Sequence, residues 1–200
     1  PPNNDGTPAK DTSTVKDDDR PLSVDNVRVN EGSPYVVFTV TGAANQLARL
    51  SLVDGTALVD ANGVPQTDGS EDYGPGLEYW DPTAGTSGQW KPYTTGSTVA
   101  LDGAGSLLVR TKILPDSLDE GDHTFRLIAT NTGGTSTPIT QGIGTIDDHG
   151  GGELFPDLPP NNDGTPAKDT STVKDDDRPL SVDNVRVNEG SPYVVFTVTG

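Results

Sequence analysis

Hydrophobic and polar residues alternate in short stretches along most of this chain. In residues 35–41, YVVFTVT, the side chains of Val36, Phe38 and Val40 fall on one face, and the two Thr residues fall on the other. Successive side chains of a strand point to opposite faces, so this period of two predicts a half-buried β-strand. The same pattern predicts strands at 23–30, 46–53, 77–80, 89–93, 97–101, 106–113, 123–131 and 137–146, with a shorter one near 57–59.

Turn-forming residues separate these stretches. The chain contains 24 Gly and 17 Pro, and no long segment carries an apolar stripe at helical spacing. Short alternating strands between Gly, Pro, Asn and Asp turns are typical of a β-sandwich, with a β-barrel as the alternative. We therefore predict an all-β protein with a modest core, because only 30% of its residues are hydrophobic.

The first 42 residues return without a change at the end of the chain. Position 1 recurs at position 159, an offset of 158 residues. This period is too long for a solenoid repeat and matches a whole domain with its linker. The predicted organisation is a linker at 1–20, a sandwich at 21–148, an acidic linker at 149–178 and the truncated start of the next identical repeat at 179–200.

The net charge of −17 changes the range of partners to expect. Nucleic acids and anionic membrane surfaces need a basic surface, so we expect neither, and we expect cations instead. The chain has no Cys, which excludes disulfides and thiolate metal sites. It has no apolar run long enough to insert into a membrane. With two His and no G-x-S-x-G motif, we expect no enzymatic activity.

Acidic residues gather at the predicted ends of strands. Glu31 follows the first strand, and Asp147 and Asp148 end the last one. If these two strands run in the same direction, their ends share one pole of the sandwich. The remaining acidic turn residues are Asp72, Asp116, Asp119, Glu120 and Asp122. Such a cluster is costly without a cation, and Ca²⁺ prefers six to eight oxygen ligands, so the sequence predicts a calcium site.

Four stretches in this order resemble the Calx-beta family: VNEGSPYVVFTVTG, EDYG, ILPDSLDEGDHTFRLIATNTGG and GIGTIDD. The resemblance covers about residues 21–148. It implies an immunoglobulin-like Greek-key sandwich of about seven strands that binds calcium at one pole. By position, the ligands that it implies are Glu31, Asp72, Asp116, the main-chain carbonyl near Leu118, Glu120, Asp147 and Asp148. His123 and His149 stand where the family often has acidic residues.

The tandem repetition, read with this resemblance, implies a calcium-binding extender repeat of a large bacterial cell-surface or biofilm adhesin. The implied partners are calcium ions, neighbouring repeats and surface glycans. The implied location is the bacterial cell surface, reached by type I export. An alternative is a carbohydrate-binding adhesive module, because Tyr79, Trp80, Trp90 and Tyr93 fall on one predicted hairpin and aromatic faces stack on sugars.

Two further hypotheses concern the repeated segments. The acidic triplet at 17–19, repeated at 175–177, could brace adjacent domains through an ion or could be a solvated linker. Residues 182–200 are identical to residues 24–42 and could therefore fill the same strand positions. The C-terminal copy could be a disordered tail, could replace the N-terminal copy, or could exchange between molecules.

Overall fold

The computed structural model describes residues 20–60, 71–116, 118, 120–133, 139–171 and 180–199. In this part of the chain the regular structure consists of strands, and no helix is long and apolar enough to cross a membrane. The acidic triplets and the segment 61–70 lie outside the described residues.

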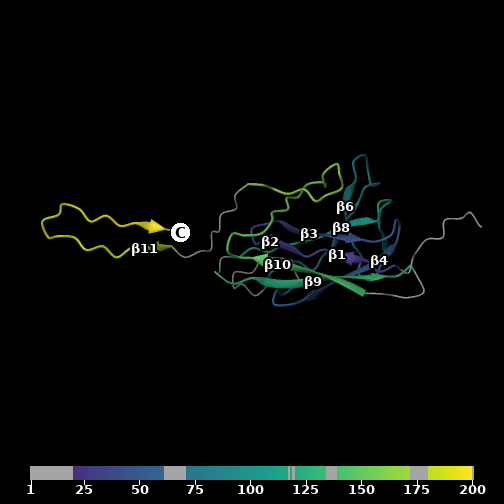
Figure 1. Cartoon of the computed structure of the whole chain (residues 1–200), viewed down its shortest axis with the longest axis horizontal. Helices are drawn as coiled ribbons and strands as arrows, with labels where there is room; N and C mark the ends of the chain where they lie inside the picture. Colours follow the sequence, from purple (N-terminus) through teal and green to yellow (C-terminus); the bar gives the residue numbers. More distant parts are fainter. Residues whose placement is uncertain are drawn as a thin grey trace, which may run out of the picture.

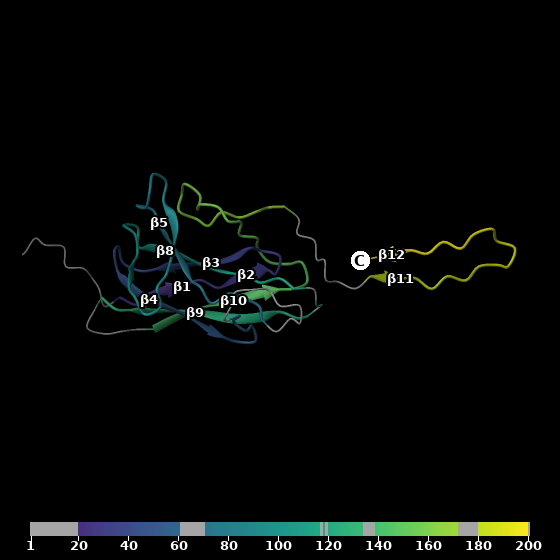
Figure 2. The same ribbon diagram turned by 180° about the vertical axis from the view of Figure 1, so that it is seen from behind.

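Among the described residues, ten strands form two five-stranded sheets. The first contains, in order, β1 (Ser23–Val24), β3 (Tyr35–Thr41), β8 (Ser106–Lys112), β5 (Glu78–Asp81) and β6 (Gln89–Pro92). The second contains β2 (Val27–Asn30), β10 (Ile139–Asp147), β9 (His123–Asn131), β4 (Leu47–Asp54) and β7 (Val99–Ala100). Figure 1 shows the sheets as two layers, and Figure 2 shows them from behind. The expected all-β, immunoglobulin-like sandwich is confirmed, and the separate sheets exclude a barrel.

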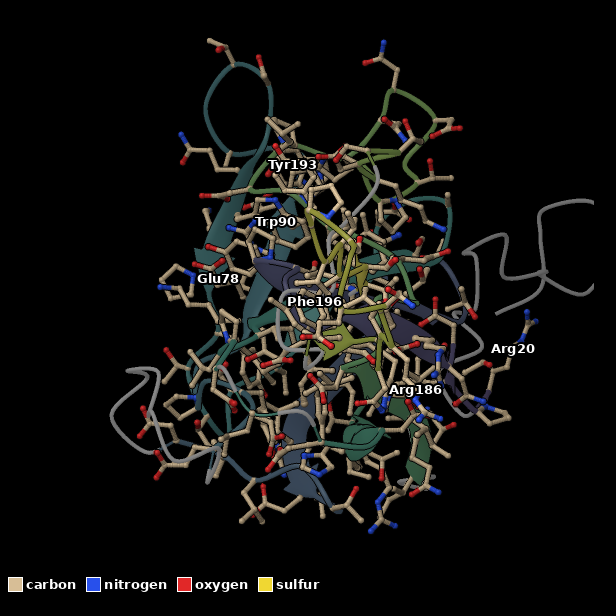
Figure 3. The ribbon with its side chains drawn as sticks, turned by 90° about the vertical axis from the view of Figure 1, so that its left-hand side faces the viewer. Arg20, Glu78, Trp90, Arg186, Tyr193 and Phe196 are labelled. Carbon is tan, nitrogen blue, oxygen red and sulfur yellow. The ribbon has the colours of Figure 1, made fainter. Side chains whose placement is uncertain are left out.

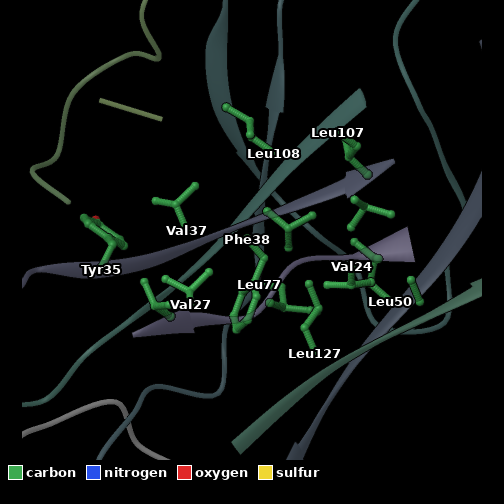
Figure 4. Packing of buried hydrophobic residues seen from close by; sticks show 14 of the residues in the cluster. Val24, Val27, Tyr35, Val37, Phe38, Leu50, Leu77, Leu107, Leu108 and Leu127 are labelled. Carbon is green, nitrogen blue, oxygen red and sulfur yellow. The ribbon is translucent and has the colours of Figure 1, made fainter. Parts of the chain in front are cut away.

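The alternating hydrophobic residues meet between the two layers. Phe38 of β3 packs edge-to-face on Phe125 of β9, with ring centroids 5.9 Å apart. The Tyr73 ring stacks on the same Phe125 ring, with ring centroids 4.3 Å apart. Figure 4 shows Phe38, Leu77 and Leu127 in this core. The core holds the strands in register and so fixes the position of the turns at each pole.

The first predicted strand, 23–30, is divided between the two sheets. β1 pairs antiparallel with β3, whereas β2 pairs parallel with β10. The side chains at the crossing satisfy neighbouring backbone groups: Asp25 accepts from the Thr39 amide, and Asn26 accepts from the Ile143 amide. Val24 and Val27 are three positions apart, so the period of two slips by one residue at the crossing, and this slip is the trace that the change of sheet leaves in the sequence.

Residues 149–171, which the sequence pattern assigns to a linker, run back along the sandwich. Glu153 pairs with the free edge of β2, since its amide donates to the Arg28 carbonyl and its carbonyl accepts from the Asn30 amide. Phe155 is 1% exposed, and its amide donates to Ser33 Oγ at 2.8 Å. The segment therefore covers part of the core and closes one sheet edge.

The C-terminal copy forms a separate two-stranded sheet. β11 (Ser181–Val182) pairs antiparallel with β12 (Val198–Thr199). Figures 1 and 2 show this hairpin beyond one end of the sandwich.

Candidate metal centre

The acidic pole is organised by the parallel pairing of β2 with β10. Asn30 pairs with Asp147 in this register, so the residues that follow, Glu31 and Asp148, leave the sheet side by side. The Glu31 amide donates to the Asp147 carbonyl at 3.0 Å, and this hydrogen bond holds the ends of β2 and β10 together. The sequence-based expectation that the first and last strands share a pole is confirmed by this pairing.

Two other segments bring carboxyl groups to the same place. In the loop between β8 and β9, the Asp116 amide donates to Glu31 Oε1 at 2.7 Å, and the Glu120 amide donates to Asp148 Oδ2. Asp72 approaches from the segment before β5. Together five carboxylates line a cavity of about 10 Å³, which has room for one water-sized atom or ion. They are Glu31, Asp72, Asp116, Glu120 and Asp148.

Asp148 provides the clearest sign of a missing partner. Its side chain is 8% exposed, and its Oδ1 atom has no hydrogen-bond partner among the described residues. A buried carboxylate oxygen without a partner is costly, and a cation would supply what it lacks. Burial also raises the pKa of Glu31 to about 8, and the neighbouring Asp148 carboxyl adds to this effect. These properties fit a site that takes up a positive charge.

His123 joins the same cluster from the first position of β9. Its Nδ1 atom lies 2.5 Å from Asp72 Oδ1 and 3.6 Å from Glu120 Oε2. Burial lowers the pKa of His123, but the hydrogen bond to Asp72 and the nearby carboxylates outweigh it, so the pKa is raised overall. The resemblance to the Calx-beta family implies that His123 replaces an acidic ligand. In the structure this histidine is instead a neighbour that offers a positive charge or a ring nitrogen.

Asp147 faces away from this cavity. Successive strand residues point to opposite faces, and Asp147 Oδ2 therefore reaches Arg28, whose Nε lies 2.7 Å away. Burial favours a higher pKa for Asp147, but the His149 amide, the Gly151 amide and Arg28 hold its pKa below the ordinary value. Asp122 and His149 lie nearby, and Arg28 also binds Asp122. Arg28 therefore neutralises this second acidic group.

Leu118 lies in the loop between β8 and β9. Its amide donates to Asp116 Oδ1 at 2.8 Å and thereby shapes the loop. Its carbonyl as a ligand stays a prediction. Asp119 lies outside the described residues.

Arg28 is a residue that sequence reasoning missed. It lies at a polar position of β2, and its register partner on β10 is Thr145, two residues before Asp147. A basic residue on the strand that leads to Glu31, close to the acidic end of a neighbouring strand, is the signal that could have revealed it.

The aromatic residues of the β5–β6 hairpin are engaged within the molecule. Trp90 donates its indole N–H to the Leu158 carbonyl at 3.0 Å, and the Arg110 guanidinium lies 4.3 Å from its ring centroid. Trp80 packs edge-to-face on Trp90, with centroids 5.5 Å apart. The Tyr93 hydroxyl accepts from the Leu50 amide and donates to the Ser97 carbonyl. These contacts hold the hairpin on the sandwich.

A first prediction follows from the raised pKa of Glu31. The folded state keeps a proton on this carboxyl between its ordinary pKa of 4.5 and about 8, whereas the unfolded chain releases it. The contribution to stability is therefore complete below pH 4.5 and is lost as the pH rises towards 8. We expect the free energy of unfolding, measured in EDTA by urea denaturation, to decrease across this window.

Glu31→Gln provides the control for that prediction, because the amide keeps an oxygen for the Asp116 N–H and does not ionise. The difference in unfolding free energy between wild type and this variant should vary with pH. A difference that stays constant from pH 5 to pH 8 would contradict the raised pKa.

Comparison with known proteins shows no family for this chain. No family model matches the chain, and no curated protein matches it. Among solved structures, the Pseudomonas aeruginosa CupB2 chaperone is 13% identical, with a TM-score of 0.36, over 60% of this chain and 52% of that one. The periplasmic chaperone SfaE is 11% identical, with a TM-score of 0.38, over 70% and 60%.

A third match is the CsuC–CsuE complex of a chaperone with a tip adhesion subunit, from Csu pili of Acinetobacter baumannii. It is 6% identical, with a TM-score of 0.32, over 64% of this chain and 56% of that one. This chain thus spans between half and two thirds of these three structures. At such identities the likeness concerns the sandwich fold alone.

These findings correct the assignment to the Calx-beta family, which is wrong: no family model matches the chain, and the solved structures described above are chaperones or a chaperone complex. Short acidic motifs at strand ends arise in any sandwich with Asp-rich turns, so they are weak evidence of a family. The adhesin extender role and the carbohydrate-binding alternative are corrected with it. The expected partners, namely calcium ions, neighbouring repeats and surface glycans, were implied by that assignment and are corrected with it. Calcium as a bound ion is tested by none of these matches and depends on the geometry of the acidic pole alone.

Proposed function

We propose that the pole of the sandwich is a structural site for one hard divalent cation, with Ca²⁺ as the ion. The observation that carries this proposal is the buried Oδ1 atom of Asp148, which has no partner among the described residues and lines a cavity with four other carboxylates. The proposal rests on this geometry and takes nothing from the compared proteins.

The ligand set favours calcium over magnesium. The carboxylates come from four separate segments of the chain, and Ca²⁺ accepts irregular sets of six to eight oxygens. Mg²⁺ requires near-ideal octahedral geometry and gives up water reluctantly. Glu31, Asp72, Asp116, Glu120 and Asp148 would hold the ion, which would replace the proton on Glu31.

The ion would have a mechanical effect rather than a catalytic one. β2 and β10 end at the site, and the loop between β8 and β9 reaches it through Asp116 and Glu120. A bound cation would cancel the repulsion among these groups and tie the loop to the two strands. We infer a cation-stabilised sandwich module with no enzymatic activity.

We also infer that the module works outside the cytoplasm, in the cell envelope or beyond it. Calcium sites of extracellular modules bind the ion weakly, because calcium is abundant outside the cytoplasm. A site built from loops, as this one is, fits such weak binding. Surface display through type I export was tied to the adhesin role and is not retained.

Thermal unfolding with and without calcium tests the proposal. At a calcium concentration about 100 times the Kd, binding adds about 2.7 kcal/mol. For a domain of this size the melting temperature should therefore rise by roughly 5–10 °C relative to EDTA. Asp148→Asn keeps the size of the side chain and removes its charge, so this rise should disappear.

Asp147→Asn is the matched control, since Asp147 is the adjacent residue and pairs with Arg28 on the other face. This variant should keep the calcium-dependent rise, whatever its own stability in EDTA. Equal calcium responses in the two variants, or none in the wild type, would exclude the site.

A further inference from the structure

His123 brings a ring nitrogen into the acidic pole, among oxygen atoms. It is the first residue of β9 and lines the same cavity as the five carboxylates. Figure 3 looks along the long axis of the molecule at this pole, which is the end of the sandwich at which β10 finishes in Figure 1. Calcium is held by oxygen ligands, so the calcium site proposed above makes no use of this nitrogen.

The nitrogen and two of the carboxylates have the spacing of metal ligands. Asp72, Glu120 and His123 offer atoms that lie within 4.8 Å of one another. Ligand atoms around a four-coordinate Zn²⁺ are about 3.3 Å apart, because its bonds to nitrogen and oxygen are about 2.0–2.1 Å long. The distances from His123 Nδ1 lie on either side of this value, at 2.5 Å to Asp72 Oδ1 and 3.6 Å to Glu120 Oε2.

Asp148 supplies a fourth ligand and an independent sign of a cation. It lines the same cavity, it is 8% exposed, and its Oδ1 atom has no hydrogen-bond partner among the described residues. A buried oxygen of this kind lacks a positive partner whatever the histidine does. One nitrogen and three carboxylate oxygens make up the four-coordinate set that Zn²⁺ prefers.

We propose that this pole also binds a transition-metal dication of the Zn²⁺ class, and that His123 is the ligand that distinguishes such an ion from Ca²⁺. The inference rests on the cation site proposed above. Imidazole nitrogen suits Zn²⁺, whereas Ca²⁺ selects oxygen. The cavity of about 10 Å³ has room for one ion, so the two ions compete for it.

Binding of Zn²⁺ replaces one hydrogen bond within the pole. His123 Nδ1 and Asp72 Oδ1 are joined by a proton across 2.5 Å. The ring nitrogen gives its lone pair to the metal, and this proton leaves to the solvent. Asp72 keeps its position, because its Oδ2 atom accepts from the Leu58 amide at 2.7 Å.

The second acidic group is the alternative place for such an ion. Asp122, Asp147 and His149 also offer atoms within 4.8 Å of one another. Arg28 already binds both carboxylates, since its Nη1 donates to Asp122 and its Nε donates to Asp147, each at 2.7 Å. An ion there would have to displace the guanidinium, so this group is the poorer site.

Calorimetric titration of the full-length, metal-free chain at pH 7 tests the proposal. Zn²⁺ and Ca²⁺ are added alone, and Ca²⁺ is then added in the presence of Zn²⁺. The wild type should bind one Zn²⁺ per chain, and the apparent affinity for Ca²⁺ should fall as the Zn²⁺ concentration rises. His123→Gln should weaken Zn²⁺ binding about tenfold or more and leave Ca²⁺ binding unchanged. The chain has two histidines, and His149→Gln, the matched control, should change neither.

The outcomes separate this inference from the calcium site. Binding of Ca²⁺ without competition from Zn²⁺, or equal Zn²⁺ affinity in His123→Gln and the wild type, would overturn the inference and leave the calcium site in place. Loss of Zn²⁺ binding in His149→Gln would assign the ion to the second acidic group and would also overturn it. If the wild type binds neither ion, the cation site itself is excluded. The competition is measured on the unaltered chain, so this part of the test does not depend on the folding of a variant.

Discussion

Replacing Phe155 with alanine should lower the free energy of unfolding by about 3–5 kcal/mol, the usual cost of removing a buried aromatic side chain. Phe155 is 1% exposed, and its backbone pairs with Tyr35 at the start of β3. The loss would extend beyond the ring, because the segment that carries it also closes the free edge of β2 through Glu153. Urea denaturation of the full-length chain, followed by circular dichroism, measures the change.

Leu158→Ala is the control for this experiment. Leu158 lies in the same segment, its side chain is 55% exposed, and its carbonyl accepts from Trp90 whatever side chain it carries. This variant should change the unfolding free energy by no more than about 0.5 kcal/mol. A comparably small change for Phe155→Ala would mean that residues 149–171 contribute little to the folded domain.

Arg110→Ala should be similarly damaging, at about 3 kcal/mol, because it removes the buried partner of a group of charges. The Arg110 side chain is 5% exposed and lies between the rings of Tyr35 and Trp90. Its Nε donates to Glu78 Oε2 at 2.7 Å, and its Nη1 donates to Asp157 Oδ1 at 2.8 Å. One side chain thus links the hairpin, the first sheet and the returning segment.

Arg28→Ala is the matched control for Arg110, since Arg28 also pairs with two carboxylates but is 49% exposed. Its pair with Asp122 is exposed on both sides, and exposed ion pairs contribute about 1 kcal/mol or less. The Asp147 side chain is buried but keeps the hydrogen bond from the His149 amide without Arg28, so this variant should be much less destabilised. Both can be measured by urea denaturation at the same ionic strength. Equal losses of unfolding free energy in the two variants would show that the contribution of Arg110 to stability does not come from its burial.

The strands could be predicted from the sequence because a half-buried strand leaves a period of two in its residues. The pattern at 35–41 matches β3, and the pattern at 123–131 matches β9. The division of 23–30 between two sheets leaves only a weak sign in the sequence: Val24 and Val27 lie three positions apart, so the period of two breaks across Asp25 and Asn26. The burial of Phe155 was hidden, because a single aromatic among Gly, Pro and Asp has no period.

The candidate site was predictable in outline. The shared pole follows from the direction of two strands, and this direction brings Glu31 beside Asp148. The pleat alone indicates that Asp147 and Asp148 face opposite sides, so the two should not have been placed in one cluster. His123 and Arg28 could not be placed, because their roles depend on which strands are neighbours in space. The family resemblance was wrong because its short motifs reflect turns that many sandwiches share.

The most direct test of the central claim is a calcium titration of the metal-free chain by isothermal calorimetry at pH 7. The account predicts saturable binding of one Ca²⁺ per chain, with proton release from Glu31 visible as a dependence of the heat on the buffer. Asp148→Asn should abolish this binding, and Asp147→Asn should preserve it. The absence of saturable binding to the folded wild-type chain would contradict the account.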